Sequence, residues 1–136
     1  MITLELITPM GEVANVIGEP MRGAGWYGHT TGLHTVAIRV LNFRGRVSVQ
    51  ATIANDPTVS DWFSVLPDAI PYIEYPQRGY VVQMPSSGET SIFGFNFMTN
   101  AMWVRALVTR DYLIPPLATP IQIMPYGVVD YVKLSY

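Results

Sequence analysis

Only two histidines, His29 and His34, are available to hold a metal ion or to transfer protons. Their spacing along an extended chain points the two imidazoles to opposite faces of a strand. A turn at Gly32 could bring them together, but no third ligand lies nearby and the chain has no cysteine. We therefore expect no metal site, and we interpret both histidines as exposed or edge residues.

The ten carboxylates do not form a recognisable catalytic pair, because most of them neighbour Pro, Gly or Ser as turn residues do. Asp56 and Asp61 could flank a calcium-binding loop, but the EF-hand pattern is missing. A Gly-x-Ser-x-Gly nucleophile elbow is missing as well. We predict that the protein is not an enzyme and uses no cofactor.

The segment Arg22-Gly-Ala-Gly-Trp-Tyr-Gly-His29 places three glycines around an aromatic pair. It lacks the Lys-Ser/Thr of a phosphate-binding loop. Trp26 and Tyr27 could stack on a sugar ring or pack into a neighbouring subunit. The alternative is that Trp26 plugs the core of its own domain.

Tyrosine supplies eight of the aromatic residues, and this side chain is favoured at protein interfaces as well as on sheet surfaces. Lys133 is the only lysine, whereas soluble monomers usually protect edge strands with lysine. We therefore expect other subunits to cover the edges and aromatic faces. The predicted interface residues are Trp26, Tyr27, Tyr72, Tyr75, Tyr80, Tyr126 and Tyr131.

A length of 136 residues predicts a single domain spanning 1–136. Only 13% of the residues are charged, and the net charge of −2 offers no attraction for nucleic acid or an anionic membrane surface. No apolar run approaches the roughly 20 residues of a membrane span. The first residues lack the features of a signal peptide. We expect a soluble product made in the cytoplasm.

Eleven glycines and eleven prolines cut the chain into short pieces, and several pieces alternate polar and apolar residues as strands do. The pieces 33–43 and 46–53 predict a hairpin around Arg44-Gly45, and 91–98 and 102–110 predict a second one around Thr99-Asn100. Further short strands are expected at 62–66, 72–75, 80–84, 121–124 and 128–134, with a crossing between sheets over 113–120. The predicted core residues are Val47, Val49, Ala51, Ile53, Phe93, Phe95, Phe97, Val104, Ala106 and Val108.

About eight to ten short strands with little helix predict an all-β fold. We expect an antiparallel β-sandwich that resembles a jelly roll. A closed barrel is the alternative.

Two segments, 48–63 and 95–106, resemble small β-sandwich proteins of tailed-phage virions. Those proteins combine a strand, an Asn/Asp-Pro-Thr turn and a Trp-Phe corner with a later Trp-Val-Arg strand. This chain has Asn55-Asp-Pro-Thr58, Trp62-Phe63 and Trp103-Val-Arg105 at the corresponding places. The resemblance covers about half of the chain and implies a virion structural role, as a capsid decoration (cement) protein or a tail component.

Two classes of function stay open. The first is a structural protein of the virion, forming a homo-oligomer, with a trimer suggested by the resemblance to phage decoration proteins, and bound to the major capsid protein or another virion protein. The second is a carbohydrate-binding module or receptor-binding tail component. Its stacking residues would be Trp26, Tyr27, Trp62 and Trp103.

Overall fold

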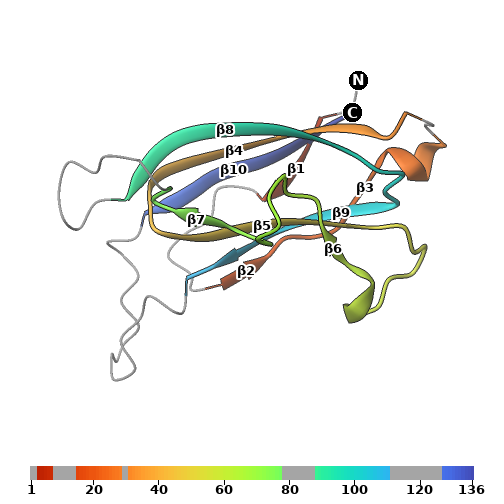
Figure 1. Cartoon of the computed structure of the whole chain (residues 1–136), viewed down its shortest axis with the longest axis horizontal. Coiled ribbons are helices and arrows are strands. Elements are labelled where there is room, and N and C mark those ends of the chain that lie inside the picture. Colours follow the sequence, from red (N-terminus) through yellow and green to blue (C-terminus); the bar gives the residue numbers. More distant parts are fainter. Residues whose placement is uncertain (1–2, 8–14, 29–30, 78–87, 111–126) are drawn as a thin grey trace.

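The chain folds into two antiparallel sheets that pack face to face (Figure 1). The structure is a computed structural model and describes residues 3–7, 15–28, 31–77, 88–110 and 127–136. Two short 3₁₀ helices, η1 (Ala24–Tyr27) and η2 (Val59–Asp61), are the helical elements of these residues. None of the described helices is long and apolar enough to cross a membrane.

Sheet A has the strand order β1-β10-β4-β8. Sheet B has the order β2-β9-β5-β6, with β3 also paired to β9 and β7 also paired to β5. The bounds in sheet A are β1 Thr3–Ile7, β10 Val128–Ser135, β4 Leu33–Phe43 and β8 Glu89–Met98. In sheet B they are β2 Asn15–Ile17, β3 Met21–Arg22, β9 Trp103–Thr109, β5 Gly45–Thr52, β6 Phe63–Ser64 and β7 Ile73–Tyr75.

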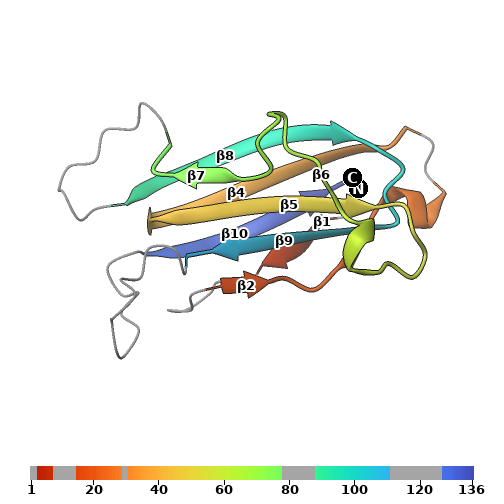
Figure 2. The ribbon, with the colours of Figure 1, turned by 60° about the horizontal axis from the view of Figure 1, so that its bottom comes forward.

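Most connections cross from one sheet to the other, so that β1, β4, β8 and β10 alternate along the chain with strands of sheet B (Figure 2). This winding is that of a jelly roll, in which two packed antiparallel sheets enclose one core. The predicted fold class, an all-β antiparallel sandwich with little helix, is confirmed.

The core lies between the sheets and follows directly from the period-two pattern, because alternate side chains of each strand point inward. Val36, Ile38 and Val40 of β4 are fully buried and face the inner side chains of β5 and β9. From sheet B the core receives Val47, Val49, Ala51, Val104, Ala106 and Val108.

The two predicted hairpins are wrong. β4 and β5 belong to different sheets, and so do β8 and β9. Both members of each pair have an apolar inner face. The two strands pack these faces toward the core from opposite sheets, and they do not lie side by side in one sheet. At the first corner the chain turns sharply, with positive φ at Asn42 (50°) and Gly45 (147°).

Two predicted core residues differ from expectation. Ile53 lies one residue beyond the end of β5 and is 68% exposed, because the strand stops at Thr52. Phe93 is half-buried, since it lies on β8 at the rim of the sandwich. The predicted strands 80–84 and 121–124 and the crossing over 113–120 lie outside the described residues, although β9 and β10 on either side of that crossing do belong to different sheets.

Candidate functional site

Those predicted interface residues that the structure describes do not gather on one surface. Tyr72 lies beside Arg46 of β5 at the outer face of sheet B, whereas Tyr131 lies on the outer face of sheet A. Tyr75 is a correction: its side chain is 2% exposed and packs edge-on against Phe43, so it belongs to the core and not to a surface. Its inward position on the short strand β7 could not be read from so few residues. Tyr80 and Tyr126 lie outside the described residues.

Trp26 and Tyr27 lie in η1, at the end of the sandwich where β1 begins and β10 ends (Figure 1). Trp26 packs against Trp103 of β9, with ring centres 5.2 Å apart, and the guanidinium of Arg22 lies 4.4 Å from its ring centre. Trp26 nevertheless remains 38% exposed and Tyr27 48% exposed. Trp26 is therefore not a core plug, and the loop presents aromatic surface to solvent.

The outer face of sheet B carries two further pairs of an arginine and an aromatic ring. The Arg105 guanidinium lies 4.2 Å from the Trp62 ring centre, and Arg46 lies 4.3 Å from that of Tyr72. Arg46 Nε also donates to Glu74 Oε2 at 2.6 Å. Each of these guanidinium groups therefore makes a cation–π contact with an aromatic ring on the same side of the sandwich.

A shallow hollow of about 410 Å³ opens beside Trp103. Its lining combines an indole with two carboxylates, an amide and two prolines: Trp103, Glu19, Asp56, Asn55, Pro20 and Pro57. The indole Nε1 donates to the Asn55 carbonyl oxygen at 3.1 Å, which holds the ring in place. A flat ring beside hydrogen-bond acceptors has the chemistry of a sugar-stacking surface.

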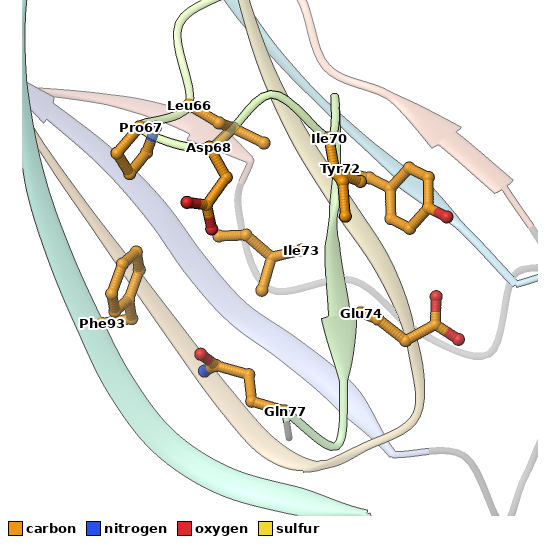
Figure 3. Close-up of a pocket in the computed structure, with 9 residues that line it drawn as sticks. All are labelled: Leu66, Pro67, Asp68, Ile70, Tyr72, Ile73, Glu74, Gln77 and Phe93. Carbon is orange, nitrogen blue, oxygen red and sulfur yellow. The ribbon is translucent and has the colours of Figure 1, made fainter. Parts of the chain in front are cut away.

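A second hollow, of about 470 Å³, lies at the rim of the sandwich between β7 and β8 (Figure 3). Phe93 of β8 faces Ile73 of β7 across it, while Tyr72 and Glu74 point away from Phe93. Leu66 and Ile70 complete its apolar lining. Pro67 and the polar side chains of Asp68 and Gln77 also line it, so the hollow combines an apolar floor with a carboxylate and an amide at its rim.

The strand beside this hollow, β8, is an edge of sheet A. β8 pairs with β4 on one side, and no described strand pairs with its other side. Its outward side chains include Ile92 and Met98, which are 62% and 72% exposed, and Met98 lies opposite Leu33 of β4, which is 49% exposed. This combination of an open edge and an apolar outer face is what soluble monomers avoid.

His34 corrects the expectation of exposed or edge histidines, because its imidazole is fully buried, whereas His29 lies outside the described residues. Nε2 accepts the Ala24 N–H at 3.0 Å, and Nδ1 lies 2.9 Å from the Gly32 carbonyl oxygen. These partners define a neutral ring protonated on Nδ1. The ring also stacks on Phe97 at 4.6 Å, so it anchors η1 to β4. An alternating strand places His34 on the inner face with Val36, and that signal could have identified it.

We expect acid to destabilise the fold through His34. Burial lowers the pKa of His34 below 6.5, although the Gly32 hydrogen bond partly opposes this. Because the unfolded chain then binds the proton more readily, the free energy of unfolding should be highest above about pH 6.5 and fall as the pH drops below it. Below the native pKa the loss should level off.

Urea melts at several pH values test this in a His29→Gln background, where His34 is the only histidine. Adding His34→Gln should flatten the pH dependence between about pH 5.5 and 7. Equal slopes in the two proteins would show that His34 does not titrate as its burial requires.

The described carboxylates form no metal-binding cluster. No group of three or more His, Asp or Glu side chains among the described residues could hold a metal ion. Asp61 caps η2 by accepting the Thr58 N–H at 2.6 Å, and this hydrogen bond lowers the pKa of its carboxyl. Glu89, interpreted from the sequence as a turn residue, is 2% exposed and accepts hydrogen bonds from Gln77 and Ser91. Both carboxylates therefore have structural partners.

Comparison of the chain with protein-family models, with curated proteins and with solved structures finds no match in any of the three. The function must therefore be argued from the surfaces of the molecule itself.

Proposed function

We propose that this chain is a non-enzymatic structural protein of a tailed-phage virion, a capsid decoration protein that stabilises the capsid through subunit contacts. The observation that carries the proposal is the edge of β8, which no described strand pairs, with the exposed Ile92 and Met98 beside it. The proposal places the protein in the virion, as a homo-oligomer in contact with the major capsid protein or another virion protein.

The fold is compatible with this role without deciding it. Jelly rolls build viral capsid domains and also lectin domains, so function has to be argued from the surface. The β8 side of sheet A has few charges: β8 has no charged residue after Glu89, and Arg39 is the only charged residue of β4, where it lies 3.7 Å from Asp130. Such a face is suited to burial against another protein.

Light scattering of the purified protein tests self-association. We expect a mass of at least twice 15.1 kDa at micromolar concentration, and a trimer would agree with the resemblance to phage decoration proteins. A mass of 15.1 kDa over the whole micromolar range would overturn the proposal that the protein assembles by itself.

The hollow beside Trp103 favours a second candidate function, that of a carbohydrate-binding module or receptor-binding tail component. Trp103 would stack on a sugar ring, and Glu19 and Asp56 would accept hydrogen bonds from the hydroxyl groups of the sugar. Binding to a glycan array that Trp103→Ala abolishes would support this candidate. An array on which the wild-type protein retains no glycan would exclude it.

A further inference from the structure

The open edge of β8 is regular over most of its length. Its pairing with β4 runs without interruption from Leu33↔Met98 to Val40↔Ser91. The sequence from Thr90 to Met98 contains no charged residue and no proline. Natural sheets use charges, prolines or bulges to keep an edge from pairing, and this edge has none of them along 91–98.

We infer that two copies of this chain pair through β8, antiparallel, about a twofold axis at Phe95, and so join two copies of sheet A into one eight-stranded sheet. The inference rests on the proposed self-assembly and names its partner, a second copy, and its register. An antiparallel pair of identical strands forms a closed twofold contact that uses the same surface on both copies. This contact produces a dimer, in place of the trimer that the resemblance implies.

The register follows from the side-chain pattern. Residues directly opposite each other in an antiparallel pair share a face, so the twofold axis must pass through a residue and not between two residues. An axis at Phe95 places Ile92 opposite Met98 of the second copy, and Met98 opposite its Ile92. These are the two large exposed apolar side chains of β8, at 62% and 72% exposure.

Neighbouring registers lose this match. An axis at Gly94 would place Ile92 opposite Asn96 and Met98 opposite Thr90. An axis at Asn96 would place Met98 opposite Gly94 and Ile92 opposite Asn100. Only the axis at Phe95 therefore pairs the two apolar side chains with each other, and cross-strand apolar pairs stabilise sheets.

The inner face and the charges are compatible with the same axis. Phe93, Phe95 and Phe97 point inward from β8, and each would lie opposite a phenylalanine of the second copy. Arg39 is one strand away from the interface, opposite Ile92 on β4, and is already close to Asp130. Pairing therefore brings no like charges together along β8.

Cysteine cross-linking tests the register, since the chain has no cysteine of its own. In the double variant Ile92→Cys/Met98→Cys, the thiol at position 92 of one copy lies opposite the thiol at position 98 of the other copy. Oxidation or a short bis-maleimide should therefore yield a covalent dimer. Six residues of strand separate the two positions by about 20 Å, which prevents a bond within one copy. Each single variant alone is the matched control and should stay largely monomeric on a non-reducing gel, whereas a mixture of the two should cross-link.

A charge placed on the edge gives an independent measurement. Ile92→Lys should raise the dissociation constant of the oligomer at least about tenfold, because the ammonium group would lie against an apolar side chain. Ile17→Lys is the control, since Ile17 is 66% exposed on β2 of the other sheet and should leave the constant unchanged.

The outcomes separate the inference from the proposed function. An oligomer by light scattering together with no cross-link in the double variant would overturn the β8 register and leave self-assembly standing. Equal cross-linking by the single variants would also overturn it. A wild-type monomer without cross-links would overturn both the β8 pairing and the self-assembly.

Discussion

Replacing Phe43 by alanine is expected to lower the free energy of unfolding by about 3–5 kcal/mol. Phe43 is fully buried at the corner where the chain leaves sheet A for sheet B. Its ring contacts Tyr75 edge-on at 5.5 Å, and the guanidinium of the buried Arg110 lies 5.6 Å from its centre. The cavity left by the substitution would therefore be bordered by rigid groups that cannot easily close it. Chemical denaturation followed by tryptophan fluorescence measures the loss.

Phe63→Ala is the matched control for this prediction, because it removes the same side chain from a position that is 41% exposed. We expect it to cost less than about 1–2 kcal/mol. If the two variants lost similar stability, the corner at Phe43 would not be packed as the structure describes.

The strands could be read from the sequence because alternation is a local property. Val36, Ile38 and Val40 all fall on the inner face as their spacing predicts, and so do Val47 and Val49. Each of these residues reports only on its own strand. The existence of the strands and their inner faces therefore did not depend on knowing their neighbours.

Strand pairing could not be read in the same way. β4 is separated from β5 by a single residue, Arg44, yet it pairs with β8 and β10 instead. A short connection favours a hairpin only when both strands stay in one layer. In this fold the connection between β4 and β5 crosses from one sheet to the other, because both strands then bury their apolar faces in the core between the sheets. The stabilising contacts come from residues far away in the chain.

The surface was the least predictable part. The tyrosine pattern did not separate Tyr75, which is buried, from Tyr72, which is half-exposed three residues earlier. The low charge of the chain did indicate unprotected edges, and among the strands that the structure describes β8 is such an edge. Whether another subunit covers that edge stays a prediction, because composition and a single chain give no partner.

The corner between the sheets also explains the second large effect, which we expect for Gly127→Ala. Gly127 precedes β10 with a φ of +68°, and a Cβ atom there would lie 2.0 Å from the Asn42 carbonyl oxygen. A positive φ costs an alanine about 1–2 kcal/mol, and displacing the backbone of β4 adds about 1–3 kcal/mol. Thermal and urea melts should therefore show a total loss of about 2–5 kcal/mol.

Gly28→Ala separates the two contributions. Gly28 has a similar φ of +75°, but a Cβ atom there would meet nothing within 4 Å. This variant should lose only the conformational part, about 1–2 kcal/mol. A loss for Gly127→Ala no larger than that for Gly28→Ala would mean that β4 and the start of β10 are not in close contact. A clearly larger loss would show that this corner closes only because residue 127 has no side chain.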